Sequence, residues 1–173
     1  MEQRVVLVDK NDNEIGTEEK LKAHQNGGKL HRAISVFVFN GKGKLMLQKR
    51  AMKKYHAKGL WANTCCSHPM HGENPLDAAH RRLKEEMGFD CEMREVFNFT
   101  YRADVGSGLT ENEFDHIIFG VYEGEPRING DEVVDWKWMT LDQLKIQIKK
   151  NPEEFAPWLV LMIDEILKHR NGQ

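Results

Sequence analysis

Hydrophobic residues near the start of the chain recur at the spacing of β-strands. Residues 5–9, 33–39 and 45–50 are each rich in aliphatic and β-branched side chains, and the valines of the second segment stand two residues apart. Residues 40–43, with the sequence Asn-Gly-Lys-Gly, are typical of a hairpin turn. We therefore expect three strands here, the last two joined as a hairpin.

The segment 75–87 follows a helical pattern instead. Its apolar side chains recur every three or four residues, at Leu76, Ala79, Leu83 and Met87. Asn74 and a proline open the segment and Gly88 follows it, and these residues are typical of the two ends of a helix. We expect a helix that buries this apolar stripe.

Strand and helix patterns mix in the rest of the chain. Strands are expected at 93–102, 114–122 and 133–139, and helices at 141–149 and 154–168. The elements do not alternate as in a parallel α/β sheet, and no repeat or long linker divides the chain. The expected fold class is α/β in the broad sense (α+β), a mixed β-sheet sandwiched between helices, in a single domain over residues 1–173.

Composition and charge narrow the functional classes. The formal net charge of −2 gives no overall basic field, so we expect no nucleic-acid partner. No apolar run approaches the ~20 residues of a membrane span, and the N-terminus lacks the apolar segment of a signal peptide. The chain has three cysteines, two of them adjacent, which favours free thiols. We expect a cytoplasmic protein with no membrane partner.

The segment 75–87 also carries paired charges. Arg81 and Glu85 are four residues apart, as are Arg82 and Glu86, so each pair shares a helix face. Taken alone, they would be two surface ion pairs. Their spacing, however, resembles the Nudix box, Gly-x5-Glu-x7-Arg-Glu-U-x-Glu-Glu-x-Gly-U, where U is apolar. Seven of its nine specified positions agree, at Glu73, Arg81, Leu83, Glu85, Glu86, Gly88 and Phe89.

Two positions of the box differ. Ser67 replaces its leading Gly, and Arg82 replaces the Glu that follows its Arg. In the Nudix hydrolases that this motif resembles, that Glu serves magnesium binding and water activation. A cation at this position argues against diphosphate hydrolysis.

These departures, with the run Asn-Thr-Cys-Cys-Ser-His-Pro at 63–69, resemble the type I isopentenyl-diphosphate isomerase family, a branch of the Nudix fold that rearranges its substrate. Nearly the whole chain is similar, although 57–59 lacks an aromatic residue and a proline that several members carry. Further family-like segments lie at 19–24, 30–33, 48–51, 99–103, 111–113 and 156–158. The resemblance implies the interconversion of isopentenyl and dimethylallyl diphosphate for isoprene biosynthesis, with this small diphosphate as the partner.

This reaction protonates an alkene at one carbon and removes a proton at another, through positive charge at a tertiary carbon. The resemblance assigns the acid and base to Cys66 and Glu113, and we expect Tyr101 to assist Glu113. It also places Trp158 against the hydrocarbon tail, where an indole face can stabilise a cation. Alternatively, Cys66 is a small hydrophobic residue buried in the core, and Trp158 only packs in the core.

Metal ligands are also implied by the resemblance. A divalent ion, Mn²⁺, Mg²⁺ or Zn²⁺, would be held by three histidines and two glutamates, which are His24, His31, His68, Glu111 and Glu113. A second ion, Mg²⁺, would join the diphosphate to Glu86 and the backbone carbonyl of Cys66. The other histidines are expected to be polar surface or loop residues, at positions His56, His71, His80, His116 and His169.

Diphosphate binding would need cations on a protein that is acidic overall. The resemblance gives this role to Lys20, Arg50 and Lys54, to which the residues add Arg82 and the hydroxyl of Ser67. Each of them, judged alone, is a solvated polar side chain. We expect the segment through residue 28 to close over the ligand, and the protein to be a monomer or a weak homodimer.

Two other functions compete with the isomerase. A Nudix diphosphate hydrolase is supported by the box but opposed by Arg82 and Ser67. A non-catalytic, metal-stabilised binding module would need the histidines and glutamates but not Cys66 or Tyr101.

Overall fold

The structure is a computed structural model that describes residues 3–171. Its strands join in one nine-stranded sheet. The strands are β1 (Arg4–Val8), β2 (Glu14–Glu19), β3 (His31–Phe39), β4 (Leu45–Arg50), β5 (Trp61–Ala62), β6 (Cys65–Ser67), β7 (Met93–Gly106), β8 (Leu109–Val121) and β9 (Val133–Met139). The helices are α1 (Lys20–His24), α2 (Pro75–Met87), α3 (Leu141–Lys150) and α4 (Pro157–Asn171), with a short 3-10 turn at Pro152–Glu154.

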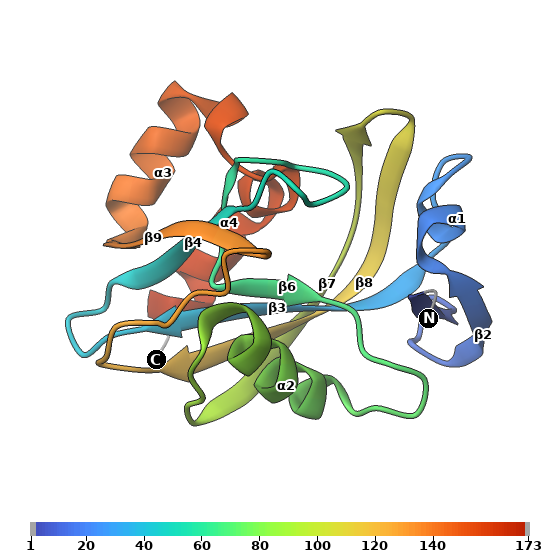
Figure 1. The fold of residues 1–173 in the computed structure, drawn as a ribbon, viewed down its shortest axis with the longest axis horizontal. Helices are drawn as coiled ribbons and strands as arrows, with labels where there is room; N and C mark the ends of the chain where they lie inside the picture. The colour runs from blue at the N-terminus through green and yellow to red at the C-terminus, as the bar shows by residue number, and fades with distance from the viewer. Residues whose placement is uncertain (1–2, 172–173) are drawn as a thin grey trace.

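The sheet is mixed because β3 pairs with β8 in parallel along its whole length, from His31 opposite Glu113 to Phe39 opposite Val121. The other side of β3 pairs antiparallel with β6, where Ser35 lies opposite Cys66. The long strands β7 and β8 form an antiparallel hairpin that crosses the middle of Figure 1, with its turn toward the upper right. This arrangement brings β6 and β8, which lie far apart in sequence, to the two sides of one strand.

The helices cover both faces of this sheet (Figure 1), which confirms the expected sandwich. On β3, Phe37 and Phe39 face the core under α3 and α4, whereas Val36 and Val38 face the core over α2. Side chains of a strand alternate between its faces, so one apolar segment supplies both cores.

Helix α2 begins and ends where the sequence pattern predicts. The side chain of Asn74 accepts a hydrogen bond from the backbone N–H of Leu76 at 2.8 Å, which caps the first turn. Gly88 ends the helix with φ +72°, and a Cβ atom there would lie 2.3 Å from the carbonyl oxygen of Arg127. Only glycine fits this end of the helix.

The prediction that β3 and β4 pair as a hairpin is wrong for most of the two strands. The two strands pair only where Phe39 lies opposite Leu45. Beyond that point β4 pairs with β9 and β5. The turn at 40–43 therefore joins two strands that diverge, because β3 takes β6 and β8 as its neighbours.

Several boundaries also differ from the sequence pattern. The strand expected at 114–122 begins at Leu109, and the helix expected from 154 begins at Pro157, after the 3-10 turn. The polar strand β2 and the short elements α1, β5 and β6 were not predicted, because they lack an apolar period of their own. None of the helices described is long and apolar enough to cross a membrane.

Candidate active site

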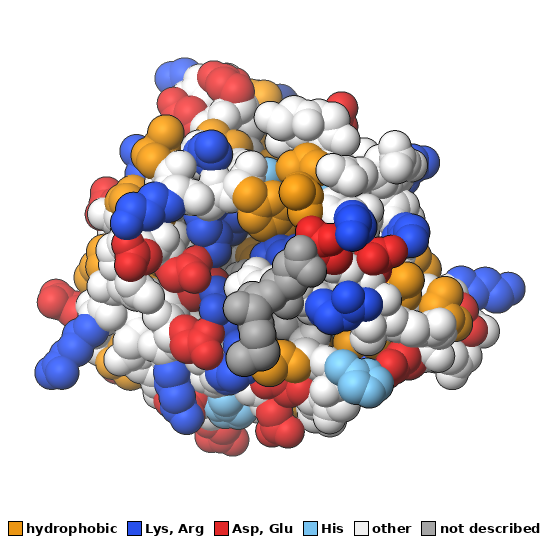
Figure 2. All heavy atoms as spheres, turned by 45° about the vertical axis from the view of Figure 1, so that its right-hand side comes forward, with side chains coloured by type: hydrophobic (Ala, Val, Ile, Leu, Met, Phe, Trp, Pro, Cys, Tyr) orange, Lys and Arg blue, Asp and Glu red, His pale blue; other side chains and the backbone are white. Residues whose placement is uncertain are grey.

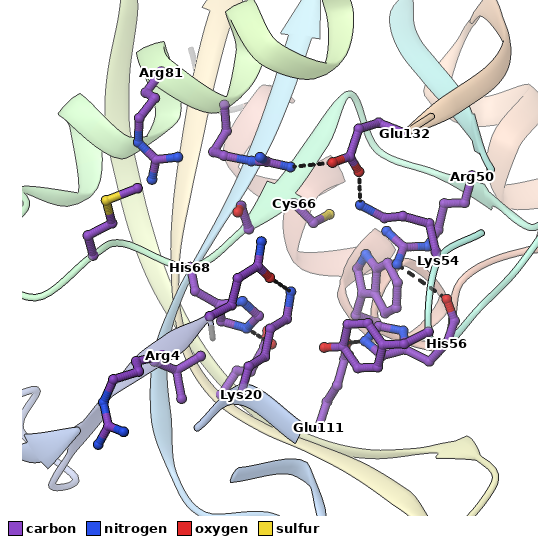
Figure 3. A pocket seen from close by; sticks show the side chains of 18 of the residues that line it. Arg4, Lys20, Arg50, Lys54, His56, Cys66, His68, Arg81, Glu111 and Glu132 are labelled. Atoms are coloured by element: carbon purple, nitrogen blue, oxygen red, sulfur yellow. Dashed lines mark hydrogen bonds and ion pairs between the residues drawn. The ribbon is translucent and has the colours of Figure 1, made fainter. Parts of the chain in front are cut away.

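A cavity of about 710 Å³ opens beside β6 and the hairpin of β7 and β8. Figure 2 shows a face of the molecule on which blue Lys and Arg side chains lie among red Asp and Glu side chains. The close view in Figure 3 places Cys66 between Glu132 and Lys54 on one side and His68 and Lys20 on the other.

The chemistry of the site follows from one face of β8. Glu111, Glu113 and Asp115 are buried and alternate along the strand, and Ile117 and Phe119 continue the same alternation into the core under α4. The face therefore changes from hydrophobic to acidic in the direction of the cavity. Because two-residue spacing keeps side chains on one face, the expectation that Glu111 and Glu113 share a face is confirmed.

Three histidines meet Glu113 at this end of the sheet. Ligand atoms of His24, His31, His68 and Glu113 all lie within 4.8 Å of one another. The Nε2 atom of His68 lies 3.0 Å from Oε1 of Glu113 and 3.2 Å from Nε2 of His31. Helix α1 carries His24, β3 begins at His31 and His68 follows β6, so distant segments build this cluster.

The histidine cluster suits a divalent metal ion. His24 and His31 each donate Nδ1–H to a backbone carbonyl oxygen at 2.7 Å, so their Nε2 atoms carry the lone pairs that can bind a metal. These Nε2 atoms lie 3.2 Å from the Tyr55 hydroxyl and 3.2 Å from Nε2 of His68, respectively. Burial, aided by the neighbouring His31, lowers the pKa of His24 to about 4, and burial lowers the pKa of His68 well below its usual range. Metal-binding imidazoles must be neutral, and these two are neutral at pH 7.

Glu111 lies in a second, overlapping group rather than with the first four ligands. It forms this group with His24 and His56, and its Oε1 lies 3.1 Å from Nε2 of His56. His56 lies in the loop between β4 and β5, which agrees with the expected surface or loop position, but it is only 7% exposed. His116 is likewise buried, between Glu95 at 2.8 Å and Asp12 at 3.1 Å. No periodic or motif signal distinguished these two histidines.

Tyr101 bridges the two glutamates. Its hydroxyl lies 2.8 Å from Glu111 and 2.6 Å from Glu113, and one hydroxyl proton can serve only one of them at a time. Burial, together with the charge of Glu113, raises the pKa of Glu111. The two carboxyl groups and the phenol therefore form a unit that can hold and pass on one proton.

Cys66 lies on β6 and lines the cavity, whereas the adjacent Cys65 faces the opposite core, over α2. The Cys66 thiol donates a hydrogen bond to Oδ1 of Asn63 at 2.9 Å. Burial raises the pKa of Cys66, with the charge of Asp115 as a second cause. The site therefore holds Cys66 as a thiol when no ligand is bound.

Three residues that support Cys66 were given no role from the sequence. Ser35 lies 3.9 Å from its sulfur and 2.7 Å from Asp115, and both residues are buried. Asn63 accepts hydrogen bonds from Cys66 and, at 3.1 Å, from the indole Nε1–H of Trp158. Each of these contacts either joins segments far apart in sequence or involves a residue in a loop. The spacing of residues within one strand or helix therefore could not predict them.

Trp158 is both a core residue and part of the cavity wall. It is 2% exposed and belongs to the core under α4, yet it lines the cavity. The guanidinium carbon of Arg50 lies 5.1 Å from the indole centroid. The ring therefore already faces one cation, which is the geometry that a cationic reaction centre needs.

The five residues expected to bind diphosphate all line the cavity, at positions Lys20, Arg50, Lys54, Ser67 and Arg82. Burial lowers the pKa of Lys20 to about 8, and the charges of Lys54, Arg82 and Arg50 lower it further in that order. Four of the five are cations, so the cavity has a basic region on a protein of net negative charge.

Glu86 is held by protein groups on several sides. It pairs with Arg82 at 2.5 Å, accepts a hydrogen bond from Gln48 at 2.9 Å, and lies 3.8 Å from Lys54. The expected pair of Arg81 and Glu85 is long, at 3.5 Å, because Arg81 binds Glu73 at 2.7 and 2.8 Å instead. The Nudix box is thus an ion-pair network in which Arg82 lies beside Glu86.

Comparison with known proteins agrees with this geometry. The NUDIX domain family matches residues 29–159. Isopentenyl-diphosphate Delta-isomerase 2 of Aromatoleum aromaticum is 52% identical over 99% of this chain and 90% of its own length. Isopentenyl-diphosphate Delta-isomerase of Serratia proteamaculans is 46% identical over 96% of this chain and 92% of its own.

Solved structures support the fold. DR0079 from Deinococcus radiodurans has a TM-score of 0.79 and 17% identity, and the match covers 94% of this chain and 98% of that one. The MutT protein from Methanosarcina mazei has a TM-score of 0.66 and 12% identity, over 80% and 94% of the two chains. From the domain match and the near full-length identity, the chain belongs to the NUDIX domain family and, within it, to the isopentenyl-diphosphate Delta-isomerases.

Proposed function

We propose that this protein interconverts isopentenyl diphosphate and dimethylallyl diphosphate by moving one proton onto and another off the allylic carbons. The observation that carries the proposal is that the Cys66 thiol and the Tyr101–Glu113 pair line one cavity whose wall also holds cations for a diphosphate. Relatives that share about half of its residues bear the name of this isomerase.

The chemistry requires two groups that exchange protons with carbon. A proton added to the terminal alkene carbon leaves positive charge at the neighbouring tertiary carbon, and loss of a proton from the next carbon forms the new double bond. We assign protonation to Glu113, assisted by Tyr101, and deprotonation to Cys66, with the roles exchanged in the reverse direction. Trp158 faces the hydrocarbon and stabilises the positive charge.

The charge state of the ligand-free site bears on this assignment. Burial keeps Cys66 protonated. Burial also raises the pKa of Glu113, but its contacts with His31 and His68 outweigh burial and lower that pKa overall. This state is ready to protonate from Cys66 and to deprotonate at Glu113. Protonation by Glu113 with deprotonation by Cys66 therefore starts from a different state, reached when one proton passes from the Cys66 thiol to the group formed by Glu113, Tyr101 and Glu111.

The proposed function includes two metal sites, which we define by the residues that would bind the ions. His24, His31, His68 and Glu113, with Glu111 beside them, would hold Mn²⁺, Mg²⁺ or Zn²⁺, and Glu86 with the Cys66 carbonyl would hold Mg²⁺ together with the diphosphate. Such ions would supply positive charge that orients Glu113 and offsets the charge of the phosphates. Arg82, which pairs with Glu86, replaces a carboxylate of the hydrolase box, so diphosphate hydrolysis is not the activity we propose.

A single experiment tests the reaction. Proton NMR of isopentenyl diphosphate with the protein, Mg²⁺ and Mn²⁺ in D₂O should show dimethylallyl diphosphate that carries solvent deuterium, with no release of inorganic phosphate or diphosphate. Release of either anion without isomerisation would instead identify a hydrolase. Neither reaction, with metal bound, would identify a binding module.

Diphosphate binding should weaken as pH rises above about 8. The charged form of Lys20 binds the anion, and its pKa of about 8 means that this charge is present at pH 7 and is lost through pH 8 to 9. We expect the dissociation constant of inorganic diphosphate, measured by calorimetry from pH 7 to 9.5, to rise by up to about tenfold per unit over this range. Lys20→Arg should remove the part of this rise that is due to Lys20, because a guanidinium stays charged. Parallel pH profiles for the two proteins would contradict the role of Lys20.

We also propose that residues 1–173 form one domain and that the protein is cytoplasmic and a monomer or weak homodimer. We further propose that the segment through residue 28 closes over bound ligand. Lys20 and His24 lie at the two ends of α1. One short helix thus carries both a cation for the diphosphate and a ligand for the metal, which supports closure of this segment over bound ligand.

A further inference from the structure

We propose that Glu132 is an internal counter-ion that occupies the diphosphate-binding cations of the ligand-free protein and sets how much negative charge a ligand needs in order to bind. The inference rests on the proposed role of Lys54 and Arg82 in binding diphosphate. Glu132 lies in the loop before β9 and lines the cavity. It belongs to neither the Nudix box nor the expected site residues.

The contacts of Glu132 are with these two cations. One carboxylate oxygen accepts a hydrogen bond from the Lys54 ammonium group, and the other lies 3.4 Å from the guanidinium group of Arg82 (Figure 3). Burial raises the pKa of Glu132, but the hydrogen bond from Lys54 and the charges of both cations outweigh it and lower the pKa overall. Glu132 is therefore an anion at pH 7.

Three carboxylates face these two cations. Glu86 and Glu132 each contact both Lys54 and Arg82, whereas Glu85 contacts Arg82 alone. Two anions, Glu86 and Glu132, therefore lie between the cations. Glu86 is fully buried and is also fixed by Gln48. Glu132 has a side chain that is 25% exposed and accepts its side-chain bonds only from the two cations among the contacts described. Of the two anions, Glu132 is the one that can leave.

Its backbone can stay in place while its side chain turns. The N–H of Glu132 donates to the carbonyl of Asn129 at 2.9 Å, and its carbonyl accepts from the N–H of Ala51 at 2.9 Å. These bonds hold the loop independently of the carboxylate. A diphosphate would then replace the carboxylate at both cations without unfolding the loop.

This exchange makes the site selective for charge. A ligand must offset the loss of two interactions of Glu132, and a diphosphate, with two charged groups, can contact both cations at once. A single phosphate group offers less charge and reaches fewer cations. Glu132 should therefore weaken the binding of all anions, and of singly phosphorylated ones most.

The test is Glu132→Gln, which removes the charge and preserves the size of the side chain. Calorimetry in metal-free buffer at pH 7 should show inorganic diphosphate binding about tenfold more tightly to this variant, and inorganic phosphate gaining more than diphosphate does. Glu132→Ala, which also removes the hydrogen-bonding group, should show the same sign. Unchanged or weaker binding of diphosphate by both variants would overturn the proposal and would make Glu132 a residue that positions Lys54 and Arg82.

The neighbouring residue provides a matched control. Asp131 lines the same cavity and pairs with Lys53 at 2.5 Å, but both side chains are more than 70% exposed. Asp131→Asn removes the same charge one residue away, and its dissociation constant for diphosphate should stay within about twofold of the wild type. An equal gain in this variant would show a general charge effect and contradict a specific role of Glu132. The NMR assay of the wild type separates this result from the proposed function, because failure to isomerise would leave the binding comparison intact.

Discussion

Replacing Cys66 by serine is expected to lower isomerase turnover on the order of 10³-fold, with the protein still folded. A hydroxyl group ionises far less readily than a thiol, so serine cannot share the exchange of a proton with carbon. The fold should survive, because a serine hydroxyl can also donate the hydrogen bond that the thiol gives to Asn63. The measurement is the rate of conversion of isopentenyl diphosphate by NMR, together with the thermal midpoint.

Cys65 supplies the matched control for this substitution. It is fully buried in the apolar core over α2 and does not line the cavity. Cys65→Ser should leave turnover per folded molecule within about threefold and lower the free energy of unfolding by about 1–3 kcal/mol, because the hydroxyl is placed among apolar side chains. Near wild-type turnover of the Cys66 variant, or equal losses in both variants, would contradict a catalytic role for Cys66.

The sequence was sufficient to predict features that depend on one segment. Helix α2 has an apolar period, a capping Asn74 and a glycine that alone fits its end, and its predicted bounds are those observed. The alternation of β3 and β8 fixes which residues face each core, and for the same reason it places Glu111 and Glu113 on one face. Local spacing determines all of these features.

Features that depend on pairing between distant segments could not be predicted. The turn after β3 has ordinary hairpin residues, but the neighbours of β3 are set by β6 and β8, which lie about 30 and 80 residues further along. The same pairing brings Ser35 to Cys66 and to Asp115. His56 shows the limit most clearly, since nothing in its own loop indicates that it will be buried against Glu111.

Stripping divalent metal is expected to abolish turnover, and the role of the histidine cluster can be tested apart from activity. His68 lies between Glu113 and His31 and is neutral because burial lowers its pKa. His68→Gln removes a ligand from the centre of this group. We expect the dissociation constants of Mn²⁺ and Zn²⁺, measured by calorimetry on the metal-free protein at pH 7, to rise by about 100-fold or more.

His71 is the control for that substitution, because it stands three residues further along the same loop. Its side chain is 71% exposed and pairs with Glu14 at 2.8 Å, outside the cluster. His71→Gln changes the same side chain in the same way, so metal affinity should stay within about twofold. If the His68 variant bound metal as tightly as the His71 variant, the buried histidines would be structural. The proton-transfer site would then have to hold Glu113 through His31, His68 and Tyr101 alone.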